Sequence, residues 1–70
     1  MFMKEIFAER LKELRTENNL GQEKLADELE VSHGTISLWE NCLREPKLSN
    51  LIRIAQYFGV SIDYLAGLEN

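Results

Sequence analysis

Apolar residues recur along this chain every three or four positions, the period expected of helices that bury one face. The pattern predicts helices over residues 3–18, 22–29, 33–40 and 48–58, and a short fifth helix after Ser61. The apolar positions that define the first four are Phe7, Leu11 and Leu14, then Leu25, Ala26 and Leu29, then Ile36 and Trp39, and last Leu51, Ile54, Ala55 and Phe58. No stretch alternates for long enough to build a sheet, so we expect an all-α fold.

Capping and turn residues mark the ends of these helices. Ser32 and Ser61 are suitable N-caps, because a serine hydroxyl can accept a hydrogen bond from the first turn. Gly59 fits the left-handed position that ends a helix, and Gly67 should close the fifth helix in the same way. Pro46 places a loop between the third and fourth helices, because proline is excluded from helix interiors.

Residues 22–41 contain two of these helices, joined by a tight turn. Neither is long enough to bury a face alone, so they must pack on one another and on their neighbours. That arrangement is a helix-turn-helix. With 70 residues, the chain should form one small domain, residues 1–70.

The composition narrows the class of protein. Hydrophobic residues make up 44% of the chain and charged residues 29%, which is enough for one core and argues against disorder. A single cysteine, Cys42, excludes an internal disulfide and fits a reducing cytoplasm, where we expect the protein. No apolar run approaches the ~20 residues of a membrane span, so we expect no membrane partner.

Chemistry-bearing residues form no catalytic pattern. Nothing pairs a nucleophile with a base, and no phosphate-binding glycine loop occurs. The lone histidine, His33, has neither a second histidine nor a nearby cysteine with which to share a metal. We therefore expect no enzyme activity, no metal, no cofactor and no small-molecule ligand.

The net charge of −4 favours a protein partner when taken alone, since nucleic-acid-binding domains usually carry a basic surface. A small acidic domain can still bind DNA if its cations cluster on one face. At physiological salt, charges more than about 8 Å away are largely screened. The arrangement of the charges therefore matters more than their sum.

Five segments follow one known pattern in order and spacing: FAERLKELRTENNL, QEKLADEL, VSHGTISLWEN, REP and NLIRIAQYFGVSIDYLAG. They resemble the phage-repressor-like (Cro/cI, XRE-type) helix-turn-helix DNA-binding family, and the resemblance covers residues 7–67. It implies a compact five-helix lambda-repressor-like fold whose recognition helix, residues 33–40, enters the major groove of double-stranded operator DNA. It also implies a sequence-specific regulator of transcription, most often a repressor.

The resemblance assigns roles to particular residues. The implied base-reading residues are His33, Gly34, Ser37 and Leu38. The implied phosphate-positioning residues are Gln22, Asn41, Arg44 and Lys47. Arg15 and Glu40 match positions that form an ion pair behind the recognition helix, and a bidentate arginine–carboxylate pair suits such a partly buried place.

Several residues depart from the family pattern. Glu30 stands where the turn usually has glycine, which puts a carboxylate near the DNA and strain in the backbone. Gly34 and Leu38 replace long polar side chains and donate no hydrogen bond to a base. Cys42 and Leu43 replace a common Gly-Lys, so a flexible cap and a phosphate-binding charge are both lost.

These departures leave few cations, so the electrostatic contribution to DNA binding should be small and a homodimer, or a larger assembly, should be needed. Phe2, Ile62 and Leu68 are either frayed ends or a two-fold interface. A dimer of this kind would span half-sites about 34 Å apart. His33 is either a contact to a base or phosphate or a solvated residue. Ser49 is the alternative to Lys47 as N-cap of the fourth helix.

A second interpretation is a helix-turn-helix domain used for protein binding, such as an antitoxin or an adaptor. The weakly basic recognition surface and the apolar Leu38 and Leu43 favour it. A third is that the chain is the DNA-binding part of a longer regulator. Neither changes the expected fold.

Overall fold

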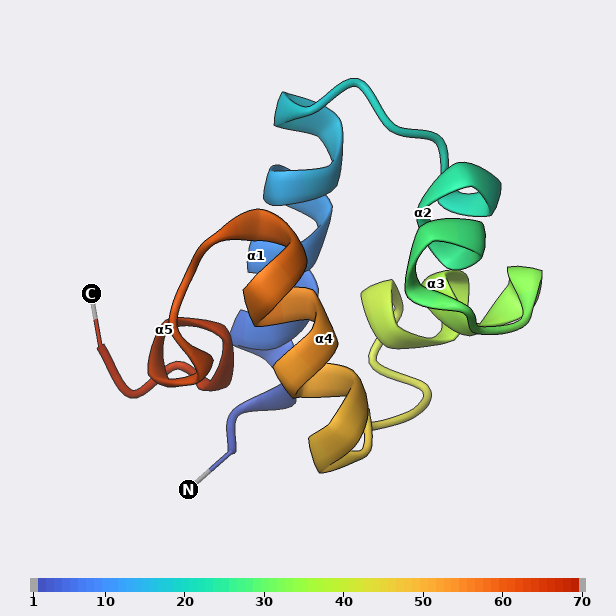
Figure 1. Ribbon diagram of the computed structural model, residues 1–70. Coiled ribbons are helices and arrows are strands. Elements are labelled where there is room, and N and C mark those ends of the chain that lie inside the picture. Colours follow the sequence, from blue (N-terminus) through green and yellow to red (C-terminus); the bar gives the residue numbers. More distant parts are fainter. Residues whose placement is uncertain (1, 70) are drawn as a thin grey trace.

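The computed structural model describes residues 2–69. It contains five helices, α1 (Lys4–Glu17), α2 (Gln22–Leu29), α3 (His33–Glu40), α4 (Leu48–Phe58) and α5 (Ile62–Ala66), and the described residues include no strand (Figure 1). The predicted all-α fold is confirmed. α1 begins and ends one residue inside its predicted range, whereas α2, α3 and α4 have their predicted bounds.

One hydrophobic core joins the helices. α3 packs on α2 and on α1, α5 packs on α1 and α4, and α4 also packs on α2, so α1 and α4 both join the two parts of the core (Figure 1). Trp39 is 1% exposed and meets the edge of Phe7, with ring centroids 6.1 Å apart. The other buried members of the core are Leu11, Leu25, Ala26, Leu29, Ile36, Leu51, Ile54, Ala55 and Leu65.

Residues in the left-handed conformation end several of the helices. Gly59 (φ 70°) and Gly67 (φ 84°) lie at the C-caps of α4 and α5, as predicted. A Cβ on Gly67 would lie 3.1 Å from the Ile6 side chain, so this position needs glycine for space as well as for conformation. Glu30, the C-cap of α2, and Cys42, two residues after α3, both have φ 59° without being glycine. The backbone is therefore strained on either side of α3.

The caps agree with the prediction only in part. The Ser61 hydroxyl accepts a hydrogen bond from the backbone N–H of Tyr64 at 2.9 Å, as predicted. Ser32 occupies the N-cap position of α3, but its side chain makes no capping bond, because its hydroxyl pairs with the Thr35 hydroxyl at 2.6 Å. The N-cap of α4 is Lys47 and not Ser49, so that alternative was wrong.

The two ends of the described chain are tied to the core. Phe2 and Ile62 are partly buried and pack against it, so their expected exposure was wrong, whereas Leu68 is 56% exposed. Arg10 joins α1 to α5, because its guanidinium lies 4.2 Å from the Tyr64 ring centroid and donates to the Tyr64 carbonyl. None of the described helices is both long and apolar enough to cross a membrane.

Candidate nucleic-acid interface

α3 is anchored along one side and exposed along the other. Ile36 and Trp39, three residues apart, are buried against α1 and α2. His33 and Gly34 are exposed at the opposite side of the first turn, and nothing lies within 4 Å of a Cβ built on Gly34. The remaining two predicted base-reading residues, Ser37 and Leu38, are half-buried, so the first turn offers the most accessible surface.

A polar network holds the C-terminal end of α3 from behind. Arg15 donates to both carboxylate oxygens of Glu40, with Nε–Oε2 at 2.7 Å and Nη2–Oε1 at 3.1 Å. The Arg15 and Glu40 side chains are 12% and 4% exposed. The third guanidinium nitrogen donates to the Leu20 carbonyl at 2.8 Å, which ties α1, the α1–α2 loop and α3 together.

The same network fixes the charge of Arg15. Its hydrogen bond to Glu40 raises the pKa of Arg15, against the lowering caused by partial burial. The guanidinium therefore stays charged at neutral pH. A charged, bidentate pair of this kind sets the direction of both side chains.

Two of the predicted phosphate-positioning residues are already hydrogen-bonded. The Gln22 amide donates to Glu40 Oε1 at 3.0 Å, so Gln22 belongs to the network behind α3. The Asn41 amide donates to the Ser37 carbonyl at 2.8 Å and caps the C-terminus of α3. The Asn41 amide also donates to the Ser37 hydroxyl at 3.3 Å, whereas the second N–H of the Gln22 amide is the one that could reach a phosphate.

Two exposed cations lie in the connection between α3 and α4, and Lys4 of α1 is exposed beside Arg44. Arg44 and Lys47 are exposed, and neither forms an ion pair with a carboxylate within residues 2–69. Two other cations on this half of the molecule are engaged: Arg53 pairs with Glu30 at 3.2 Å and Lys24 with Glu28 at 3.5 Å.

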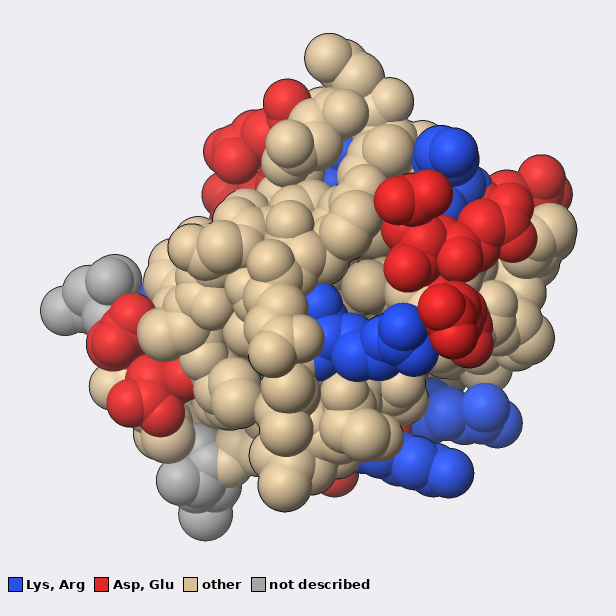
Figure 2. Space-filling model, viewed as in Figure 1, with Lys and Arg blue, Asp and Glu red and all other residues tan. Residues whose placement is uncertain are grey.

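Charge is therefore divided across the surface around α3. Figure 2 shows acidic side chains gathered over α2, with basic side chains toward the connection between α3 and α4. The acidic residues of α2 and of the turn after it are Glu23, Asp27, Glu28 and Glu30. An approaching phosphate backbone would be attracted at the C-terminal end of α3 and repelled near α2.

At the N-terminal end of α3, His33 Nε2 lies 2.9 Å from Asp27 Oδ1. The hydrogen bond and the charge of Asp27 raise the pKa of His33. Sequence analysis missed Asp27, because no local rule connects two residues six apart across a turn. In the sequence, Asp27 is visible only as an aspartate of the predicted helix 22–29, which packs on the helix 33–40.

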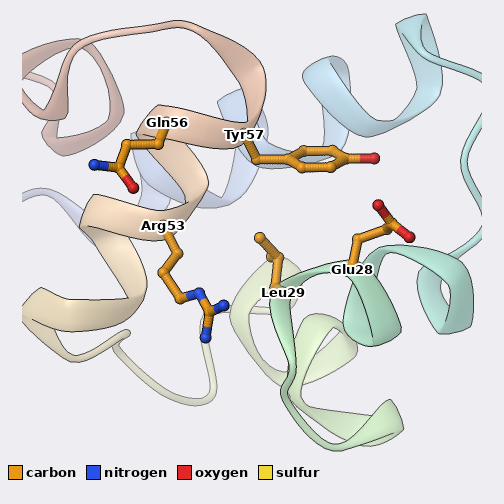
Figure 3. Close-up of a pocket in the computed structure, with 5 residues that line it drawn as sticks. All are labelled: Glu28, Leu29, Arg53, Gln56 and Tyr57. Carbon is orange, nitrogen blue, oxygen red and sulfur yellow. The ribbon is translucent and has the colours of Figure 1, made fainter.

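A shallow groove lies between α2 and α4 and includes no residue of α3. It is lined by Glu28, Leu29, Arg53, Gln56 and Tyr57, and the Tyr57 ring extends from α4 toward Glu28 (Figure 3). Arg53 faces Glu30 across one end of it. The groove combines no nucleophile with a base. Among the residues that the structure describes, no three His, Cys, Asp or Glu side chains gather as a metal site.

Comparisons with known proteins agree with this geometry. Residues 11–65 match the family model described as helix-turn-helix. The HTH-type transcriptional activator BcrR of Enterococcus faecalis is 46% identical over 63 residues, which are 90% of this chain and 31% of BcrR. The cryptic phage CTXphi transcriptional repressor RstR of Vibrio cholerae is 32% identical over 57 residues, which are 81% of this chain and 51% of RstR.

Among solved structures, the P22 c2 repressor in complex with a synthetic operator is similar, with a TM-score of 0.85 and 30% identity. The match covers 91% of this chain and 97% of that one. The chain spans only 31% and 51% of the two curated relatives, so it corresponds to one part of each. The five-helix fold, the network behind α3 and these matches together show that the chain belongs to the helix-turn-helix family of phage-repressor-like domains.

Proposed function

We propose that this protein is a sequence-specific DNA-binding regulator of transcription that reads the major groove with α3. The observation that supports the proposal is the way in which the rest of the domain holds α3. The eight-residue helix α3 is fixed at its C-terminal end, where Arg15 and Gln22 donate hydrogen bonds to its own Glu40, while its first turn stays exposed. The similarity to a repressor bound to an operator supports the same use of the helix.

In this mechanism the two ends of α3 have different tasks. His33 and Gly34 enter the groove first, with Ser37 and Leu38 beside them, and the small Gly34 lets the backbone come close to the bases. Arg44 and Lys47 contact phosphates after the C-terminal end, together with the side-chain amides of Gln22 and Asn41, and the Asn41 amide exchanges its bond to the Ser37 hydroxyl for one to the phosphate. Phosphate contacts set the orientation, and base contacts set the sequence preference.

Arg44 and Lys47 are the two cations per subunit that we assign to phosphates, and because their attraction is weak, we propose that the protein binds as a homodimer. Four neutralised phosphates correspond to a salt slope of about −4. Leu48 and Ile52, one turn apart on α4, are 66% and 38% exposed, and Leu43 in the preceding connection is 73% exposed. These three apolar side chains replace Phe2 and Ile62 as the proposed two-fold contact.

We propose repression as the regulatory outcome, exerted in the cytoplasm where the chromosome lies. Repression requires only that the protein occupy a promoter, which a DNA-reading domain can do unaided. RstR is named a repressor and BcrR an activator, so a promoter–reporter assay decides the direction. Reporter output that rises when the protein is produced would contradict repression but leave DNA binding intact.

DNA binding is tested by fluorescence anisotropy with a labelled pool of random duplexes at two salt concentrations. We expect measurable affinity at low salt that falls steeply at high salt. Sedimentation of the protein with and without DNA tests the dimer, with a Leu48→Ser, Ile52→Ser variant as the comparison. Anisotropy that stays flat at low salt would contradict the proposed function.

The alternative is binding to a protein, as an antitoxin or adaptor would. It is favoured by the acidic surface of α2 and by the exposed Leu43. It predicts that removing the charges of Arg44 and Lys47 leaves the regulatory activity of the protein unchanged. The DNA mechanism predicts the opposite.

A further inference from the structure

The contact between Asp27 and His33 lies at the place where α3 would meet the first base. His33 is the first residue of α3, and its Nε2 atom is 2.9 Å from Asp27 Oδ1 on α2. Both side chains remain open to solvent, at 57% and 64% exposure. The imidazole therefore has one nitrogen held by the protein and another, Nδ1, free to meet a ligand.

The carboxylate decides which nitrogen carries a proton. An ionised carboxylate can only accept a hydrogen bond, so the proton between the two residues must belong to His33 Nε2. In the neutral ring this leaves Nδ1 without a proton, as an acceptor. In the charged ring Nδ1 also carries a proton and becomes a donor.

Bases differ in whether they present hydrogen-bond donors or acceptors in the major groove. In the major groove guanine presents two acceptors, O6 and N7, whereas cytosine presents the N4 amino donor. Adenine presents the N6 amino donor beside its N7 acceptor. An Nδ1 donor therefore matches guanine best, because guanine presents two neighbouring acceptors, whereas thymine presents O4 alone and the adenine N7 acceptor lies beside a donor. An Nδ1 acceptor matches cytosine or the adenine amino group.

We propose that Asp27 is a positioning residue that sets the base preference of His33: guanine while the imidazole is charged, and cytosine or adenine once it is neutral. The proposal rests on the proposed function, since it assumes that the first turn of α3 lies in the major groove. It assigns a role in specificity to a residue of α2 that itself touches no base.

The surroundings of His33 raise the pH at which this change occurs above the ordinary histidine value. Asp27 raises the pKa of His33 by hydrogen bond and by charge, and Glu23, one turn earlier on α2, acts in the same direction. Glu30 in the turn is engaged by Arg53 from α4. From α1, Arg15 is bound to Glu40 at the other end of α3. No cation from these elements pairs with Asp27 in place of His33 within the described residues.

The test is a selection of bound duplexes from a randomised pool, run at about pH 5.5 and about pH 8.5, on either side of the ordinary histidine range. One position of each half-site should change from guanine to cytosine or adenine. The preference at that position should be about tenfold in each direction, as expected for one hydrogen-bonded contact. Replacing the guanine with 7-deazaguanine, which lacks the N7 acceptor, should weaken binding at the lower pH only.

The variant Asp27→Asn separates positioning from charge. An amide can accept from or donate to Nε2, so the neutral ring is no longer confined to one tautomer and the preference at the higher pH should disappear. Glu23→Gln is the matched control: it removes a charge from the same helix, so overall affinity should rise while the base change persists. Nitrogen NMR of the free protein should show one imidazole tautomer in the wild type and a mixture in Asp27→Asn.

The outcomes distinguish this inference from the proposed function. A pool from which no sequence is enriched at either pH contradicts DNA binding itself. A motif that is enriched but identical at both pH values, or that Asp27→Asn leaves unchanged, contradicts the inference and leaves DNA binding standing. A mixture of tautomers in the wild-type protein would also overturn it.

Discussion

The two ends of α3 are built in opposite ways. At the C-terminal end, Glu40 is 4% exposed and receives hydrogen bonds from both Arg15 and Gln22. At the N-terminal end, His33 has one partner, Asp27, and both side chains are more than half exposed. The C-terminal end of α3 is therefore fixed by buried hydrogen bonds, and its N-terminal end is an exposed surface.

This difference separates stability from recognition. The buried pair sets the angle of the helix, and breaking it leaves the Arg15 charge largely buried without a carboxylate, bonded to the Leu20 carbonyl. The exposed pair contributes little to stability, because water competes for both groups. It can therefore change its protonation and its partners without unfolding the domain.

The first prediction concerns the pair of Arg15 with Glu40. Glu40→Ala should lower the free energy of unfolding by about 3 kcal/mol, because Arg15 would be left partly buried and unpaired. Urea denaturation followed by circular dichroism measures the change. Glu28→Ala, which breaks an exposed pair with Lys24, is the control and should cost at most about 0.5 kcal/mol. Equal losses in the two variants would mean that the Glu40 pair is no stronger than a surface pair.

The second prediction concerns Arg44 and Lys47, the cations that follow the C-terminal end of α3. Arg44→Ala combined with Lys47→Ala should weaken binding to all DNA sequences alike and reduce the salt slope by about 2 per subunit. Stability should not change, since both side chains are exposed. Anisotropy titrations over a salt series provide the slope, and Lys12→Ala on α1 serves as the control. A loss confined to one sequence would mean that these residues contact bases.

The third prediction concerns the strained turn before α3. Glu30→Gly should raise the free energy of unfolding by about 1 kcal/mol, because glycine adopts φ 59° without strain. The lost pair with Arg53 is exposed and offsets little of this gain. DNA affinity should rise as well, since a carboxylate disappears and Arg53 is released. Glu30→Gln, which removes the charge but keeps the strain, should raise affinity without raising stability.

The fourth and smallest effect is the pH dependence of the exposed end. Asp27 raises the pKa of His33 in the folded protein above the ordinary 6.5. The contribution of the pair to stability is therefore complete below pH 6.5 and is lost as the pH rises through the folded-state value. Thermal melts of the wild type and of His33→Gln should differ at the lower pH and converge at the higher pH. A difference that grew with pH would have the wrong sign.

Much of the fold could be predicted from the chain alone. The bounds of α2, α3 and α4 followed from apolar periodicity and from breakers such as Pro46 and Gly59, because these act over one or two helical turns. Single side chains were less predictable. Ser32 lies at its N-cap, yet its hydroxyl pairs with Thr35, because the choice between two partners depends on a rotamer and not on spacing.

The set of helices, the core and the family follow from the order of the residues, since each depends on the local apolar period or on residues in register. The partners of the polar side chains follow from the packing of the helices: Gln22 with Glu40, Arg53 with Glu30, and His33 with Asp27. The two kinds of feature differ in range. A hydrogen bond needs its atoms within about 3 Å, and only the packing of helices brings residues from different helices that close.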